Sequence, residues 1–136
     1  MNILVIDAQG GGVGKQLVAA IKKACPGLHI TAVGTNTAAT SAMLSAGADQ
    51  AATGENAVVV NCRKADVIIG PIGIVIADSL LGEITPAMAL AVGQSPAKRI
   101  LIPFDNCDNI IVGTEQMSAR KRIESAVETV AGMISG

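Results

Sequence analysis

Short runs of aliphatic residues alternate along the chain with segments in which apolar residues recur every three or four positions. Continuous aliphatic runs are typical of strands in a parallel sheet covered on both faces, and the longer period is typical of helices packed on such a sheet. The runs predict strands at 2–7, 29–34, 66–70 and 99–103, and a weaker one at 50–52. This alternation indicates an α/β fold of three layers, Rossmann-like, with a mostly parallel sheet.

Helices are predicted between these strands. The first follows a glycine-rich stretch and stops at Pro26-Gly27, and a second covers 39–45. The segment GENAVVVNCRKA (54–65) is ambiguous, because its three consecutive valines favour a strand locally. We assign it to a helix, since a right-handed crossover is needed before the next strand. Thr85-Pro86 then supplies an N-cap and a first-turn proline for a further helix.

The C-terminal part predicts an edge hairpin and a last helix. The run RILIP, the polar turn FDNCDN and the run IIVG (110–113) follow one another so closely that the two runs are expected to pair antiparallel. Ile123, Val127 and Val130 then fall on one side of a helix. No linker or repeat interrupts the pattern, so residues 1–136 are expected to form a single domain.

Composition excludes several classes of function. Half of the residues are hydrophobic, yet Phe104 is the only aromatic residue, which leaves no platform for stacked bases and argues against nucleic-acid binding. The net charge is −1, and the short basic runs, such as 120–122, are interpreted as solvated ends of helices and strands. The longest apolar stretch is broken by glycine and proline and is too short for a bilayer, and no secretory signal is recognised.

The cysteines predict a reducing compartment. Cys25, Cys62 and Cys107 are far apart and have no C-x-x-C spacing, so neither a metal site nor a disulfide framework is expected. A cytoplasmic protein with reduced thiols is the simplest interpretation. Cys107 lies between turn residues and beside two acids, which would raise a thiol pKa, so an inert turn residue is favoured.

The stretch DAQGGGVGK is the candidate ligand-binding loop. Gly10, Gly11, Gly12 and Gly14 stand between the first strand and the first helix, and Lys15 follows them directly. Glycines let backbone amides approach an anion, and the helix points the positive end of its dipole at the same place. These five residues are therefore predicted to bind a phosphate. A glycine-rich turn without a ligand is the alternative.

The loop matches no phosphate motif completely. Lys15 stands where the dinucleotide fingerprint needs its last glycine, and the Walker pattern lacks its first glycine and its hydroxyl. The best match is the short-chain dehydrogenase pattern, with Ala8 in place of the first glycine. Asp7 adds a complication, because a carboxylate there repels phosphate unless it faces away, caps the loop, or serves as a base or metal ligand.

Polar residues after the other strands extend the predicted site. Thr35 and Asn36 follow the second strand and are expected to contact a ribose or a 2′-phosphate, which favours NADP or a mononucleotide. Asp7, Glu55 and Glu83 are the candidates for a general acid or base. The only histidine, His29, begins a strand at the opposite rim, so catalytic couples that need histidine are not expected.

The apolar segment PIGIVIADSLLGEI (71–84) predicts self-association. A segment of this apolarity must pack on its own domain, fold over the ligand as a lid, or meet a partner subunit. Because the chain is short, we favour the partner, in a homodimer that uses Ile74 and Ile76.

Six segments together resemble a small bacterial family known only as a domain of unknown function. They are DAQGGGVGKQ, VGTNTAATSAMLSAGA, ATGENAVVVN, DVIIGPIGIVI, LGEITPAMA and SPAKRILIPFDNC. The resemblance implies a compact Rossmann-like protein of the bacterial cytoplasm, and it implies no reaction. Our hypothesis is a protein that binds a phosphorylated small molecule, such as a nucleotide or NAD(P). Whether it is an enzyme or a non-catalytic sensor or structural subunit remains open.

Overall fold

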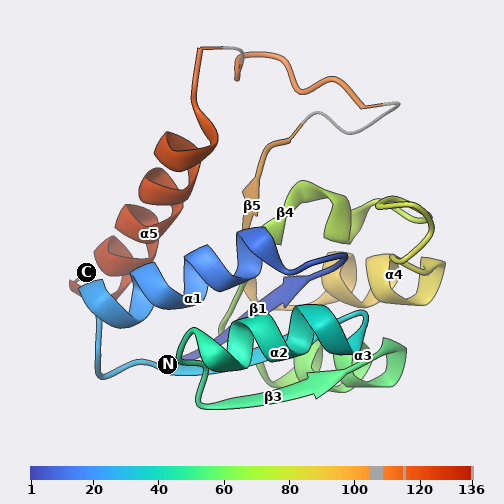
Figure 1. The fold of residues 1–136 in the computed structure, drawn as a ribbon, viewed down its shortest axis with the longest axis horizontal. Coiled ribbons are helices and arrows are strands. Elements are labelled where there is room, and N and C mark those ends of the chain that lie inside the picture. The colour runs from blue at the N-terminus through green and yellow to red at the C-terminus, as the bar shows by residue number, and fades with distance from the viewer. Residues whose placement is uncertain (105–108, 115, 136) are drawn as a thin grey trace.

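The computed structural model describes residues 1–104, 109–114 and 116–135, and its described part contains a five-stranded parallel sheet (Figure 1). The spatial order of the strands is β3-β2-β1-β4-β5. The strands are β1 (Asn2–Asp7), β2 (His29–Gly34), β3 (Gln50–Thr53), β4 (Val67–Pro71) and β5 (Lys98–Ile102). The most buried strands are β1 and β4, at the middle of the sheet, as expected from their continuous aliphatic sequences.

Helices cover both faces of this sheet. The helices are α1 (Gly12–Ala24), α2 (Thr37–Ser45), α3 (Glu55–Lys64), α4 (Pro86–Gln94) and α5 (Ala119–Ser135), with a short 3-10 turn η1 (Ile72–Val75). On one face α1, α2 and α5 pack on the strands, and on the other α3 and α4 do so. The helix assigned to GENAVVVNCRKA is confirmed as α3, which buries Val58 and Cys62.

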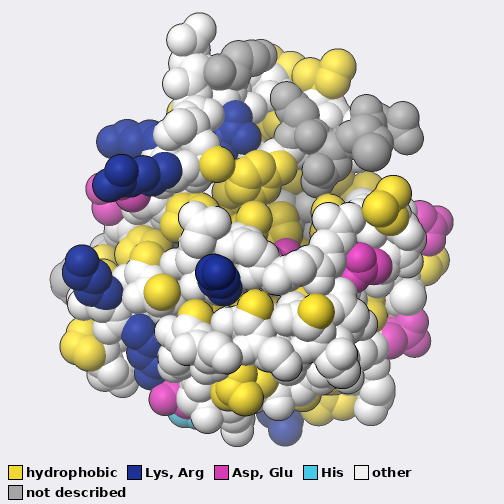
Figure 2. All heavy atoms as spheres, viewed as in Figure 1, with side chains coloured by type: hydrophobic (Ala, Val, Ile, Leu, Met, Phe, Trp, Pro, Cys, Tyr) yellow, Lys and Arg dark blue, Asp and Glu magenta, His cyan; other side chains and the backbone are white. Residues whose placement is uncertain are grey.

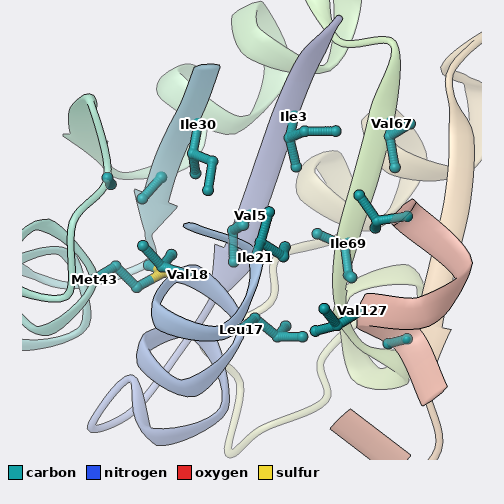
Figure 3. Close-up of a cluster of buried hydrophobic side chains, with 14 of the residues drawn as sticks. Ile3, Val5, Leu17, Val18, Ile21, Ile30, Met43, Val67, Ile69 and Val127 are labelled. Atoms are coloured by element: carbon teal, nitrogen blue, oxygen red, sulfur yellow. The ribbon is translucent and has the colours of Figure 1, made fainter. Parts of the chain in front are cut away.

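The two cores fix the position of β1. Figure 3 shows Ile3 and Val5 of β1 beside Ile69 of β4, facing Leu17 and Ile21 of α1. The alternate residues of β1 point to the opposite face, where they meet α3 and α4. Because both faces of β1 are buried, its carboxyl end has a fixed position at the point where the glycine-rich loop begins.

The predicted antiparallel hairpin is wrong. All strand pairs in the described part of the chain are parallel, and residues 110–113 form no strand. Instead the Thr114 hydroxyl donates to the Ile111 carbonyl (2.8 Å), and Gly113 has a positive φ of 92°. Arg122 then donates to the carbonyls of Pro103 (2.7 Å) and Thr114 (2.6 Å). These bonds fasten the connection to α5 rather than to the sheet edge.

The apolar segment 71–84 packs mainly on its own chain. The expectation that Ile74 meets a partner subunit is therefore wrong. Ile74 and Ile84 are fully buried in the core beneath α4, whereas Ile76 is half-buried. Leu81 alone among the large apolar residues of this segment is strongly exposed, at 88%. The η1 turn and a series of left-handed residues fold the segment back, which local apolarity could not reveal.

Within the described residues, no helix combines the length and the apolarity needed to cross a membrane.

Candidate functional site

A pocket of about 460 Å³ lies where the chain reverses direction across the sheet. From β1 the chain proceeds to β2 and β3 on one side, and it later returns to β4 and β5 on the other. Loops leaving the carboxyl ends of β1 and β4 therefore diverge, and open parallel sheets bind ligands in such a crevice. The loop 7–13 forms one wall, and Pro71, Leu80, Phe104 and Arg122 form the other. Figure 2 shows apolar side chains gathered in the hollow on this face.

The four glycines of the loop have two different roles. Gly11 has φ 72°, and a Cβ there would lie 2.8 Å from the Ala39 Cα of α2. At Gly14 a Cβ would lie 2.5 Å from the Met43 sulfur. Gly10 and Gly12, which line the pocket as Gly11 does, have no atom within 4 Å of an added Cβ. Two glycines thus allow the loop to pack on α2, and two leave its surface open to the pocket.

Asp7 caps this loop. Its carboxylate accepts hydrogen bonds from the amides of Ala8 (2.8 Å) and Gly14 (2.6 Å), and the residue is only 5% exposed. Burial raises the pKa of Asp7, the Gly14 and Ala8 amides oppose this rise, and the charge of Glu83 adds to it. Of the alternatives open from sequence, capping is the one observed. The carboxylate thereby occupies an amide that the helix would otherwise offer to a phosphate.

Glu83 binds polar groups of the loops that follow β1 and β2. Its Oε1 accepts hydrogen bonds from the Gln9 amide (2.9 Å), the Thr35 hydroxyl (2.7 Å) and the Asn36 side-chain amide (2.7 Å). Asn36 also donates to the Gln9 carbonyl (2.9 Å) and accepts from Ala39 at the start of α2. Partial burial acts to raise the pKa of Glu83, but the bonds from Thr35, Gln9 and Asn36 outweigh it and lower the pKa. Thr35 and Asn36 therefore bind Glu83 and do not line the pocket.

Arg122 is the cation of the pocket, and the sequence did not single it out. Two of its nitrogens bind the carbonyls of Pro103 and Thr114, and its guanidinium carbon lies 5.7 Å from the ring centre of Phe104. Among the described residues, no carboxylate pairs with this guanidinium and its buried Nε has no hydrogen-bond partner. The run 120–122 was interpreted as a solvated helix end, and only the tertiary fold turns Arg122 toward the pocket. The sole aromatic residue, Phe104, which lies two residues after the end of β5, was the available signal.

The other candidate residues lie away from the pocket. Lys15 is exposed on α1 and Glu55 begins α3 beside the edge strand β3. His29 lies at the opposite end of the sheet, with its Nδ1 3.2 Å from the Asn2 side-chain oxygen. Burial raises the pKa of the Cys62 thiol to about 11, so this thiol is inert at neutral pH. Cys107 lies outside the described residues.

The comparisons identify the family. The chain belongs to the family described as Domain of unknown function (DUF3842), whose profile matches residues 2–135. This confirms the resemblance drawn from the six sequence segments. The comparison with curated proteins found no match.

Two solved structures are similar in fold. One is a dodecameric FMN-dependent UbiX-like decarboxylase from Escherichia coli O157:H7, with a TM-score of 0.53 and 15% identity over 100% of this chain and 95% of that chain. The other is the crystal structure of AibC, with a TM-score of 0.46 and 17% identity over 96% of this chain and 38% of that chain. At such identity the first of them shows a shared α/β fold.

Proposed function

We propose that the pocket binds a phosphorylated small molecule of nucleotide type. Its phosphate would lie between the amides of Gly10 and Gly12 on one wall and the Arg122 guanidinium on the other. The observation that carries this proposal is the Arg122 guanidinium, which pairs with no carboxylate among the described residues and lines the same pocket as the bare backbone of Gly10 and Gly12. A guanidinium and free backbone amides are the donors that phosphate groups prefer.

The remaining walls suit the rest of such a ligand. Pro71, Leu80 and Phe104 give the pocket an apolar side against which a planar ring can pack. The volume of about 460 Å³ falls within the range of roughly 300–1,000 Å³ common for small-molecule sites. The structural neighbour that shares the fold is FMN-dependent, which supports a flavin or another nucleotide as the ligand class.

One feature favours a binding role over catalysis. Both oxygens of Asp7, the carboxylate that lines the pocket, already accept hydrogen bonds from the loop. A non-catalytic ligand sensor is therefore the form of the proposal that these residues support best, with Asp7 as the residue to test for acid or base chemistry.

Thermal unfolding in the presence of ligands tests the proposal. FMN, AMP and inorganic phosphate are the probes, and a ligand at 100 times its Kd stabilises the folded state by about 2.7 kcal/mol. Gly12→Val places a side chain into the pocket without striking a neighbour at its Cβ, so it should fold and lose the response. Gly93→Val, at an equally open glycine of α4, is the matched control and should keep it. An absent response to all three probes would remove the proposal.

The homodimer expected from the sequence remains a prediction. Because Ile74 is buried in its own chain, self-association would have to use other surfaces. Light scattering at micromolar concentration measures it directly, and the mass of a single chain would contradict the prediction.

A further inference from the structure

The two sides of the glycine-rich loop differ. On the side of β4 and β5 lies the pocket. On the side of β2 the carboxylate of Glu83 lies among Gln9, Thr35 and Asn36 and accepts a hydrogen bond from each. Dinucleotides bind across both halves of such a crevice, with one nucleotide on each side of the loop.

The segment that carries Glu83 is tightly held. Four left-handed residues shape it, since Asp78, Leu80, Leu81 and Gly82 have φ values of 65°, 56°, 59° and 84°. The Asp78 amide donates to the Ile84 carbonyl (2.7 Å), and the Ser79 hydroxyl donates to the Gly73 carbonyl (2.5 Å). Ile84, next to Glu83, is fully buried. The carboxylate is thus presented by a fixed turn rather than by a free surface side chain.

Glu83 opposes a second nucleotide in two ways. Its Oε1 takes the Gln9 amide of the loop and the donors of Thr35 and Asn36, so none of these three donors is open to a second nucleotide while the carboxylate stays in place. Its negative charge also repels a second phosphate placed over the loop near Gln9. The charge of Glu83 also acts on Asp7 in the pocket wall, but a ligand confined to the side of β4 and β5 places no second phosphate over Gln9 and leaves the three hydrogen bonds of Glu83 in place.

We infer that Glu83 restricts this site to mononucleotides and excludes dinucleotides such as FAD and NAD. The inference rests on the proposed function and narrows its ligand class. One phosphate and one ring system fit the pocket between Gly12 and Arg122. The adenosine half of a dinucleotide finds its place occupied by the protein's own carboxylate.

Matched ligand pairs test the inference by titration calorimetry. FAD is FMN extended by AMP, and NAD is nicotinamide mononucleotide extended by AMP, so each pair isolates the second nucleotide. The wild-type protein should bind the smaller member of a pair at least about tenfold more tightly, as expected for juxtaposed like charges. In Glu83→Ala the ratio of the two Kd values should fall toward one. Glu55→Ala removes an exposed acid beside β3 and should keep the wild-type ratio.

A second variant covers the case in which Glu83→Ala fails to fold. Glu83→Gln keeps the shape and one acceptor oxygen but removes the charge, so it should reduce the discrimination part of the way. Equal binding of FMN and FAD by the wild-type protein would overturn the inference while leaving the proposed function intact. An unchanged ratio in a folded Glu83 variant would overturn it as well. Failure of all four ligands to bind would instead refute the proposed function on which it rests.

Discussion

Replacing Gly11 by alanine should destabilise the protein, whereas the same change at Gly12 should stabilise it slightly. The two residues are neighbours in one loop, but Gly11 has φ 72° and its added Cβ would lie 2.8 Å from Ala39 Cα and 3.0 Å from Ala39 O. Gly12 begins α1 with an ordinary backbone conformation and open space around its Cβ. Comparing the two variants therefore distinguishes a glycine that is needed for packing on α2 from one that only keeps the loop surface open.

The magnitude for Gly11→Ala follows from two penalties and one gain. A left-handed alanine costs about 1–2 kcal/mol. Displacing the backbone of α2, which cannot rotate away as a side chain can, costs about 1–3 kcal/mol. Alanine also lowers the conformational entropy of the unfolded chain, which stabilises the folded state by about 0.4–1 kcal/mol. The net loss is about 1–5 kcal/mol, while Gly12→Ala retains only the gain of about 0.4–1 kcal/mol.

Thermal unfolding followed by far-UV circular dichroism measures both variants. The chain contains no Trp or Tyr, so the helix signal is the better probe. Gly11→Ala should lower the Tm by about 3–25 °C, given roughly 3–5 °C per kcal/mol for a chain of this size. A Gly11→Ala variant as stable as Gly12→Ala would refute the left-handed turn packed on α2, and with it the division of the glycines into two roles.

Three further changes test other parts of the structure. Because the pKa of Asp7 is raised in the folded state, protonated Asp7 favours the fold, and this stability is lost as the pH rises from 3.8 through the folded pKa. The urea midpoint of the wild-type protein should therefore fall over this pH range, and the midpoint of Asp7→Asn should not. An identical pH profile for the two proteins would contradict the buried cap. Leu81→Gly should stabilise the protein by about 0.5–1 kcal/mol, since Leu81 is left-handed and 88% exposed. The control Leu44→Gly, in α2, should instead destabilise it by about 1 kcal/mol. Equal effects of the two changes in thermal melts would argue against the strained turn. Ile74→Asp buries an unpaired carboxylate in the core and should destabilise the fold by about 4 kcal/mol or more, so a folded variant by circular dichroism would show that this residue is not interior.

Local signals in the sequence predicted most of the fold. The strands and helices up to Ile102 lie within two residues of their expected bounds, because aliphatic runs, caps such as Thr85 and stops such as Pro26 act over a few neighbouring residues. The valine run of α3 was resolved only by the need for a crossover. After Ile102 the same local logic failed. The run 110–113 has strand propensity but forms no strand, and Arg122 of α5 instead binds the carbonyls of Pro103 and Thr114 on either side of it.

The position of the pocket could be predicted from the sequence, but the contacts around it could not. Strand ends and glycines located the loop, and the structure puts Gly10, Gly11 and Gly12 in the wall of a pocket. Thr35 and Asn36 lie at the predicted rim, yet they bind a carboxylate that comes from 47 or more positions along the chain. Arg122 likewise reaches the pocket only through the packing of α5. Pairings over such separations leave no mark in a single sequence.

We propose that the pocket between the glycine-rich loop and Arg122 binds a phosphorylated mononucleotide. Titration of ¹⁵N-labelled protein with FMN, followed by two-dimensional NMR, tests it residue by residue in a chain of 136 residues. We predict saturable shifts of the amides of Gly10, Gly12 and Val13 and of the Arg122 Nε–H, with the amides around the groove between α3 and α4 unchanged. Shifts confined to that groove, or none at millimolar FMN, would contradict the account.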